Sequence, residues 1–101
     1  MKTTADLKEG IKLMESTDNS MLLDVRSPRE YSEGHLKGSI NIPLDTLPKA
    51  VMDGLIPKAK TLFVYCRSGA RSKRACIFLD KNGYETVNIG GVMSYDGALE
   101  K

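Results

Sequence analysis

The hydrophobic positions at the start of the chain recur at the interval of one helix face. Leu7, Ile11 and Met14 are separated by four and three residues, which aligns them on a single apolar stripe. This spacing predicts a helix within the first sixteen residues. Thr4 is the expected N-cap, because its hydroxyl can accept a hydrogen bond from a free backbone N–H group.

A different pattern, short and almost continuously apolar, predicts the strands. Residues 21–25 form such a run, which is typical of a strand covered on both faces in a parallel sheet. Residues 61–65 form the strongest candidate strand because of their high β-propensity. Two shorter candidates lie at residues 39–42 and 85–89, and the glycine pair at 90–91 is expected to form a tight turn.

Several further segments have helical signals. Ser27 followed by Pro28 is a typical N-cap and first helical residue, so a short helix is expected through Glu33. Residues 72–82 predict a longer helix that Gly83 stops, because glycine readily adopts the left-handed conformation of a helix end. Weaker helical patterns cover residues 46–54 and 93–99.

Strands and helices therefore alternate at short intervals along the chain. This order predicts an α/β fold in which helices cover a mainly parallel sheet. A chain of 101 residues with 41% hydrophobic side chains suffices for one small core, so residues 1–101 are expected to form a single domain.

The composition argues against several classes of function. The 15 basic and 13 acidic residues leave a formal net charge of +2, which does not indicate a nucleic-acid or membrane partner. The apolar runs are at most five residues long, too short for a membrane span or a signal-peptide core. Two cysteines are too few for a disulfide framework. We therefore expect a soluble, cytoplasmic protein.

Residues 65–74 stand apart because they combine a cysteine, small residues and positive charge. They follow the strongest candidate strand and precede a predicted helix, where open α/β sheets commonly bind ligands. Residues 67–74 contain four basic side chains and no acidic one. The small residues Ser68, Gly69 and Ala70 allow a tight loop whose backbone N–H groups converge on an anion.

Cys66, at the entrance of this loop, is the candidate nucleophile. The loop N–H groups and the side chains of Arg67 and Arg71 are expected to favour its thiolate, lowering the thiol pKa below the ordinary value of about 8.5. Cys66 would then be partly ionised at neutral pH and would face a pocket that attracts anions. A merely structural cysteine at a strand end would leave the basic loop unexplained.

The segment resembles the active-site loop of the rhodanese family of sulfurtransferases. Other stretches resemble the same family in the same order along the chain, and together they cover nearly all of it: residues 22–26, 30–31, 34–43 and 88–92. Two positions depart from the common pattern. Tyr95 stands where the family often has Trp, and Ser39 replaces a common Ala.

The resemblance implies a parallel five-stranded sheet flanked by helices and a Cys66 that carries sulfane sulfur as a persulfide. A small anionic donor such as thiosulfate would load Cys66, and cyanide or a cellular thiol would unload it, without a cofactor. The guanidinium groups would orient the donor, and the loop backbone would stabilise the persulfide. A protein that donates or accepts sulfur transiently is a further candidate partner. The expected substrate-binding residues are Arg67, Ser68, Gly69, Ala70 and Arg71.

Three alternative functions are weighed against this one. Phosphatases and arsenate reductases have a related loop with five residues between cysteine and arginine, whereas four separate Cys66 from Arg71. The shorter loop forms a tighter ring, which suits one additional sulfur atom better than a phosphoryl group. The fold could also serve as a persulfide carrier with little thiosulfate turnover, or as a regulatory binding module, although a module has little need of Cys66 in a complete basic loop.

The other cysteine and the single histidine are expected to be structural. Cys76 lies in an apolar helical segment and is predicted to be a buried thiol, too far from Cys66 for a disulfide. His35 belongs to the resemblance motifs, and transfer through a pre-ionised thiolate needs no general base. One histidine and two separated cysteines offer no metal site.

Three charged residues follow the first buried strand: Asp24, Arg26 and Glu30. A buried charge needs a partner, so an ion pair that fixes the geometry of this corner is expected. Asp24 is also a candidate for the border of the active-site pocket.

Overall fold

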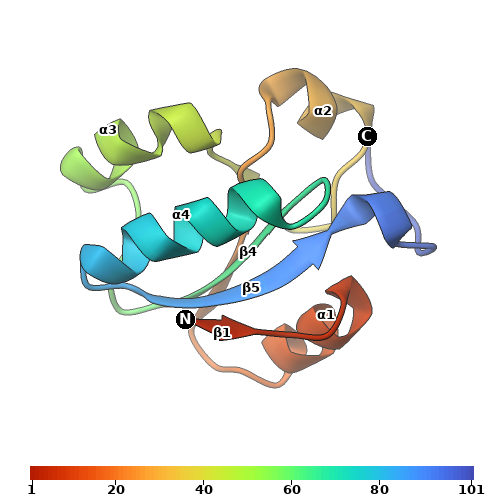
Figure 1. Cartoon of the computed structure of the whole chain (residues 1–101), viewed down its shortest axis with the longest axis horizontal. Helices are drawn as coiled ribbons and strands as arrows, with labels where there is room; N and C mark the ends of the chain where they lie inside the picture. Colours follow the sequence, from red (N-terminus) through yellow and green to blue (C-terminus); the bar gives the residue numbers. More distant parts are fainter.

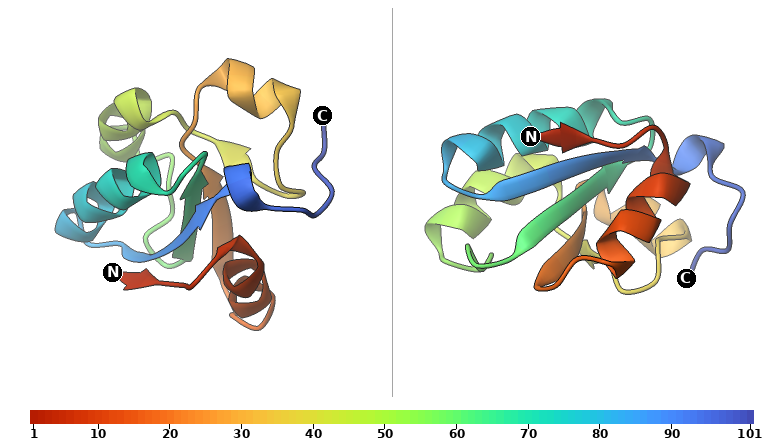
Figure 2. Two further views of the ribbon diagram at one scale, coloured as in Figure 1. Left: turned by 45° about the vertical axis from the view of Figure 1, so that its right-hand side comes forward. Right: turned by 90° about the horizontal axis from the view of Figure 1, so that it is seen from below.

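A parallel sheet of five strands runs through the middle of the molecule and carries the candidate nucleophile at the end of its central strand. The computed structural model describes residues 1–101. All strand pairings are parallel, and the order across the sheet is β1-β5-β4-β2-β3 (Figures 1 and 2). The predicted α/β fold and the five-stranded sheet are therefore confirmed. The strands are β1 (Lys2–Thr3), β2 (Ser20–Asp24), β3 (Ile40–Asn41), β4 (Thr61–Cys66) and β5 (Glu85–Gly91).

Helices cover both faces of this sheet. Two of them, α3 and α4, lie on one side and α1 lies on the other, while α2 lies beside the C-terminal segment (Figures 1 and 2). No helix combines the length and the apolar character needed to cross a lipid bilayer. The helices are α1 (Leu7–Glu15), α2 (Pro28–Glu33), α3 (Leu47–Met52) and α4 (Ala70–Lys81), with short 3₁₀ helices η1 (Leu44–Thr46) and η2 (Val92–Ser94).

Alternate side chains of β4 pack into two separate cores. Leu62, Val64 and Cys66 belong to the cluster beneath α3 and α4, whereas Phe63 and Tyr65 belong to the cluster against α1. All five residues are at most 1% exposed, as expected for the central strand of a parallel sheet. Cys66 therefore ends β4 on the side that α4 covers.

Ser39, where the family resemblance leads one to expect alanine, uses its hydroxyl to contact a buried tyrosine. Its Oγ donates to the carbonyl oxygen of Leu36 at 2.7 Å and lies 2.9 Å from the hydroxyl oxygen of Tyr65. The Tyr65 hydroxyl also accepts a hydrogen bond from the N–H of Leu36 at 3.0 Å. The serine thus gives the buried tyrosine a second polar partner, which a buried hydroxyl needs.

The N-terminal helix is confirmed, but its start differs from the prediction. Its N-cap is Asp6, whose carboxylate accepts a hydrogen bond from the N–H of Glu9 at 2.9 Å. Thr4 does not cap the helix; its N–H donates to the carbonyl oxygen of Asn88 at 3.1 Å, at the end of β1. The strand β1 itself was not predicted, because two residues are too few for an alternating pattern.

The predicted C-terminal helix at residues 93–99 is wrong. Only the short η2 is helical, and farther along the chain Glu100 pairs with His35 through two backbone hydrogen bonds of 2.8 Å. Met93 and Leu99 are 65% and 40% exposed. Without a buried apolar face, a short helix gains no stability from packing.

Other boundaries also differ from the prediction. The glycine pair at 90–91 forms no tight turn; both residues belong to β5, near an irregularity in the register between β5 and β4. The helix expected at residues 46–54 is divided into η1 and α3. It ends at Met52, two residues before the predicted end, and Leu55 beyond it is 65% exposed.

We expect Gly10→Ala to destabilise the fold, because Gly10 of α1 lies directly against Ile89 of β5. A Cβ atom at position 10 would overlap with the Cβ and Cγ2 atoms of Ile89, which are branched and held in the core. The expected loss is about 1–3 kcal/mol of unfolding free energy, measured by urea denaturation.

Lys12→Ala is the control on the same helix. Lys12 is exposed, so its replacement is expected to change stability by no more than about 0.5 kcal/mol. A Gly10→Ala protein as stable as this control would contradict the close packing of α1 on β5.

Candidate active site

The loop after β4 wraps around the sulfur atom of Cys66. Gly69 takes a left-handed conformation (φ 99°), which reverses the chain and starts α4 at Ala70, two residues before the predicted start. The N–H group of Gly69 donates to Cys66 Sγ at 3.0 Å. Cys66 itself is fully buried. The predicted loop of converging N–H groups is therefore present around the predicted nucleophile.

Hydrogen bonds favour the thiolate of Cys66. Burial by itself raises the pKa of this thiol, but the hydroxyl of Ser72 and the N–H groups of Ser72, Gly69 and Ser68 outweigh burial, and the pKa lies below its ordinary value. The direction agrees with the sequence prediction. The source differs from it in part, because the main favourable contributions come from these N–H and O–H dipoles rather than from the arginine side chains.

Ser72 is a site residue that the sequence analysis missed. Its Oγ lies 3.5 Å from Cys66 Sγ, 2.7 Å from Oδ1 of Asn88 and 3.0 Å from the carbonyl oxygen of Gly69. Asn88 Oδ1 also accepts the N–H of Gly90 at 3.1 Å, so β5 holds the hydroxyl in place. The sequence feature that could have identified Ser72 is its position in the first turn of the helix that follows the loop.

The double glycine of β5 lies directly against the loop. A Cβ atom at Gly91 would overlap with the carbonyl oxygen of Arg67, so only glycine fits at this contact. The same carbonyl accepts a hydrogen bond from the N–H of Met93 at 2.9 Å. The end of β5 and the N–H group of Met93 thus fix the position of the loop backbone.

The two arginines of the loop have different surroundings. Arg71 donates from Nη1 and Nη2 to the two carboxylate oxygens of Glu30 at 2.7 and 2.9 Å. Hydrogen bonding to Arg71 is the main reason that the pKa of Glu30 falls to about 2. Arg67 is exposed and has no carboxylate partner. Of the two predicted donor-binding arginines, Arg67 therefore has the uncommitted guanidinium group.

The corner after β2 is held by a buried ion pair. Arg26 contacts Asp24 at 2.8 Å and donates a second hydrogen bond to the carbonyl oxygen of Gly34 at 2.6 Å. Asn41 donates to the carbonyl oxygens of both Asp24 and Arg26. The expected ion pair is confirmed for Asp24 and Arg26, whereas Glu30 pairs with Arg71 instead. Asp24 is fully buried and does not border the pocket.

A cavity of about 540 Å³ opens beside the loop. Its charged lining comes from Arg26, Glu30, Glu33 and Arg67, and η2 with the C-terminal segment provides apolar side chains such as Met93. This volume suits a small molecule. Arg67 is the cation in its lining that no carboxylate neutralises.

Cys76 and His35 are both held by packing or hydrogen bonds, and neither is a hydrogen-bond partner of Cys66 Sγ. Cys76 is fully buried and forms no disulfide, and burial raises the pKa of its thiol to about 12. The ring of His35 stacks on Tyr31 with centroids 3.8 Å apart, and its Nδ1 lies 2.9 Å from the Tyr31 carbonyl oxygen. No three His, Cys, Asp or Glu side chains lie together in a group suited to a metal ion.

Comparisons with known proteins show the family of this chain. The family model of the rhodanese-like domain matches residues 6–101. A putative sulfurtransferase of Bacillus subtilis, YtwF, is 36% identical, over 94% of this chain and 88% of that protein. The thiosulfate sulfurtransferase PspE of Escherichia coli is 38% identical, over 69% and 68%.

Other matches extend the comparison to structure and to larger proteins. The crystal structure of a rhodanese-like domain protein from Staphylococcus aureus superimposes with a TM-score of 0.83 and 27% identity, over 99% of this chain and 97% of that one. A tRNA uridine(34) hydroxylase of Cronobacter sakazakii is 34% identical over 84% of this chain, which spans only 26% of that protein. The same domain thus also occurs within a longer protein of a different name.

We expect Ser72→Ala to raise the pKa of Cys66, because the variant removes the hydroxyl that stabilises the thiolate while keeping the backbone N–H groups. The measurement is the rate of alkylation by iodoacetamide as a function of pH. It is made in a Cys76→Ala background, so that Cys66 is the thiol that reacts. The midpoint should move to higher pH.

Ser68→Ala is the matched control for this measurement. The side chain of Ser68 is exposed and only its N–H group acts on the sulfur, so the midpoint should stay in place. An unchanged midpoint in Ser72→Ala would refute the role given to the hydroxyl.

We expect Glu30→Gln to lower stability by about 1–2 kcal/mol at neutral pH, since solvent screens a pair whose side chains are 27% and 34% exposed. The pKa of Glu30 is depressed from 4.5 to about 2, so the ion pair stabilises the fold fully above pH 4.5 and is lost as the pH falls through 2. Urea denaturation at several pH values measures the difference from the wild type, which should vanish in this window.

Glu33→Gln is the control on the same helix. Its carboxylate is 66% exposed and lies 3.9 Å from Arg29, so its loss should cost less than about 0.5 kcal/mol. A Glu30→Gln deficit that persists undiminished at pH 2 would show that the ion pair is not its cause.

Proposed function

Because this chain belongs to the rhodanese-like domain family, we propose that it is a sulfurtransferase that moves sulfane sulfur through a persulfide on Cys66. The observation that carries this proposal is the contact between Cys66 Sγ and the loop, in which the N–H of Gly69 and the hydroxyl of Ser72 favour a thiolate at the end of a buried strand. The names of the sulfurtransferase relatives support the same class of reaction.

Loading begins when the Cys66 thiolate attacks the outer sulfur of thiosulfate. The bond between Cys66 Sγ and that sulfur forms as the sulfur–sulfur bond of thiosulfate breaks, and sulfite leaves with the electron pair. The products are an anionic persulfide on Cys66 and sulfite, so atoms and charge balance without an external oxidant. The N–H groups that favour the thiolate also favour the persulfide anion.

In unloading, the sulfur of Cys66 changes from nucleophile to leaving group. Cyanide or a thiol attacks the outer sulfur of the persulfide, the sulfur–sulfur bond breaks, and the Cys66 thiolate is the leaving group. Its depressed pKa makes it a good leaving group. The products are thiocyanate or the persulfide of the acceptor, and Cys66 returns to its starting state.

Arg67 is the residue best placed to attract the donor. Its exposed guanidinium group lines the 540 Å³ cavity and has no carboxylate partner, whereas both terminal nitrogens of Arg71 are hydrogen-bonded to Glu30. Thiosulfate is a dianion whose sulfonate oxygens suit a planar, bidentate donor. We assign orientation of the donor to Arg67 and support of the loop to Arg71.

Two alternatives use the same residues differently. A phosphatase would need room for a tetrahedral oxyanion, but the Gly69 N–H already lies 3.0 Å from the sulfur in a loop with four residues between Cys66 and Arg71. A persulfide carrier would keep the chemistry of Cys66 and receive sulfur from a partner protein instead of thiosulfate. Loading by thiosulfate distinguishes the proposed enzyme from this carrier.

We expect thiosulfate to add the mass of one sulfur atom to the protein, and cyanide to remove it with release of thiocyanate, because Cys66 is the nucleophile. Intact-mass spectrometry before and after each reagent measures both steps. Cys66→Ala should show no gain.

Cys76→Ala is the matched control, since Cys76 is a buried thiol with a raised pKa and should not carry sulfur. Sulfur gain by Cys66→Ala would overturn the mechanism. Release of phosphate from an aryl phosphate without formation of thiocyanate would favour the phosphatase instead.

A further inference from the structure

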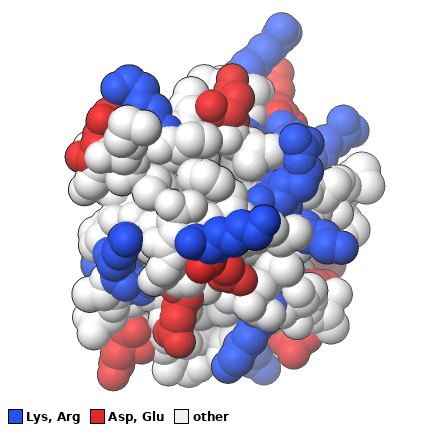
Figure 3. Space-filling view, turned by 60° about the vertical axis from the view of Figure 1, so that its left-hand side comes forward, with Lys and Arg blue, Asp and Glu red and all other residues white.

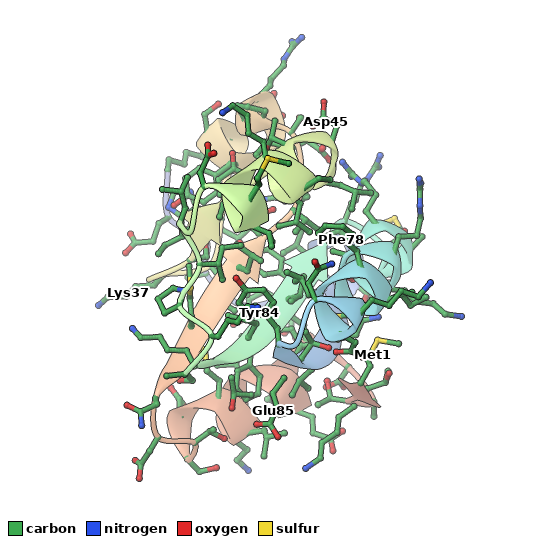
Figure 4. The ribbon with its side chains drawn as sticks, turned by 90° about the vertical axis from the view of Figure 1, so that its left-hand side faces the viewer. Met1, Lys37, Asp45, Phe78, Tyr84 and Glu85 are labelled. Carbon is green, nitrogen blue, oxygen red and sulfur yellow. The ribbon has the colours of Figure 1, made fainter.

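An apolar groove of about 530 Å³ runs between α3 and α4, on the other side of the Glu30–Arg71 pair from the cavity that Arg67 lines. Its apolar lining includes Val25 of the corner after β2, Leu44 of η1 and Phe78 of α4. Figure 4 shows Phe78 between α3 and α4, with Asp45 at the upper end of the same region. No step of the proposed transfer described above uses this groove.

One end of the groove lies near Cys66, which is not itself part of the groove lining. In the register between β2 and β4, Asp24 pairs with Tyr65, and the N–H of Val25 donates to the Tyr65 carbonyl oxygen at 3.1 Å. Val25, which lines the groove, therefore lies level with Cys66 on the neighbouring strand. Leu44 is joined to this point, since its N–H donates to the carbonyl oxygen of Val25 at 3.1 Å.

Two arginines of α4 line the groove. Arg71 and Arg74 are three residues apart and therefore share a helix face with Phe78, which follows four residues later. Arg71 is close enough to Cys66 for the negative charge of the thiolate to help raise the pKa of the arginine, after the larger effect of Glu30. Arg74 is exposed and has no carboxylate partner.

These features limit what the groove can bind. The apolar lining favours an aliphatic body, and the free guanidinium of Arg74 favours one carboxylate. Asp45 lies at the border of the same groove and disfavours a second anionic group. On this side of the molecule, an uncharged area lies above the centre of the surface, and Lys and Arg side chains lie on both sides of it and across the middle (Figure 3).

We infer that the α3–α4 groove is the acceptor site and that it binds a small organic thiol with an aliphatic chain and a single carboxylate. This inference rests on the proposed sulfur transfer, which needs a thiophilic acceptor beside Cys66. The acceptor thiol attacks the outer persulfide sulfur, and the Cys66 thiolate leaves. The product is the hydropersulfide of the acceptor, which then releases its proton to solvent. Thiosulfate has no apolar part and gains nothing from this lining, which separates the acceptor groove from the donor cavity.

Binding is tested with hexanoate, which has the chain and the carboxylate but no thiol and cannot react. Hexanoate is expected to shift the NMR signals of Leu44 and Phe78, and hexan-1-ol is expected to bind more weakly. Arg74→Gln should weaken hexanoate binding about threefold to tenfold, because it removes one ion pair. Lys73→Gln, which removes the same charge from an exposed position of α4 outside the groove, should not.

Acceptor preference is tested with 6-mercaptohexanoate and 6-mercaptohexanol. The ratio of kcat/KM for the acid to that for the alcohol is expected to exceed one and to fall about threefold to tenfold in Arg74→Gln but not in Lys73→Gln. An equal ratio in all three proteins would overturn the inference.

The two proposals fail in distinguishable ways. In one case thiosulfate loads Cys66, but hexanoate does not bind in the groove or binds equally well to Arg74→Gln. The proposed sulfur transfer is then supported and the proposed acceptor site is wrong. If hexanoate binding depends on Arg74 but no sulfur is gained from thiosulfate, the groove is a carboxylate site and the proposed function fails.

Discussion

The candidate site depends on the close approach of two backbones, those of Gly91 in β5 and Arg67 in the loop. No Cβ atom fits between them, and the carbonyl oxygen of Arg67 is further held by the N–H of Met93. That carbonyl is directed onto β5, and the N–H group of Gly69, two residues later, is directed at Cys66 Sγ. The left-handed conformation of Gly69 then leads the chain into α4. The arrangement around the sulfur is therefore fixed by the backbone, and little reorganisation is needed when an anion forms there.

The fold was largely predictable because its signals are local and strong. The strands β2 and β4 are buried and appear in the sequence as short apolar runs. The start of α2 is indicated by the adjacent residues Ser27 and Pro28, which cap and open the helix. The errors lie where tertiary contacts decide the conformation. The strand β1 has two residues and exists because β5 offers an edge, and the C-terminal segment is held by a bridge between Glu100 and His35 rather than by its own pattern.

The candidate site was predictable in its centre and not in its partners. A cysteine before small and basic residues identified Cys66 and the loop, because that chemistry is contiguous in the sequence. The contacts of Ser72 with Asn88 and of Arg71 with Glu30 join residues 16 and 41 positions apart. Nothing local indicates such pairs. The ion pair leaves Arg71 partly neutralised. Against the opposing effect of burial, the pKa of Cys66 is lowered mainly by the hydroxyl of Ser72 and then by the backbone N–H groups of the loop.

The second cysteine of the chain shows that hydrogen-bond donors, and not a lack of burial, lower the pKa of Cys66. Cys66 and Cys76 belong to the same buried cluster, and neither has any exposed surface. Burial raises the pKa of Cys76 to about 12, whereas the pKa of Cys66 is lowered although burial opposes ionisation there as well. The difference is that the loop directs N–H and O–H donors at Cys66, so that the ion replaces its lost hydration with hydrogen bonds already in place. A thiol placed in this core without the loop would keep a raised pKa, as Cys76 does, so the loop is the source of the lowered pKa of Cys66.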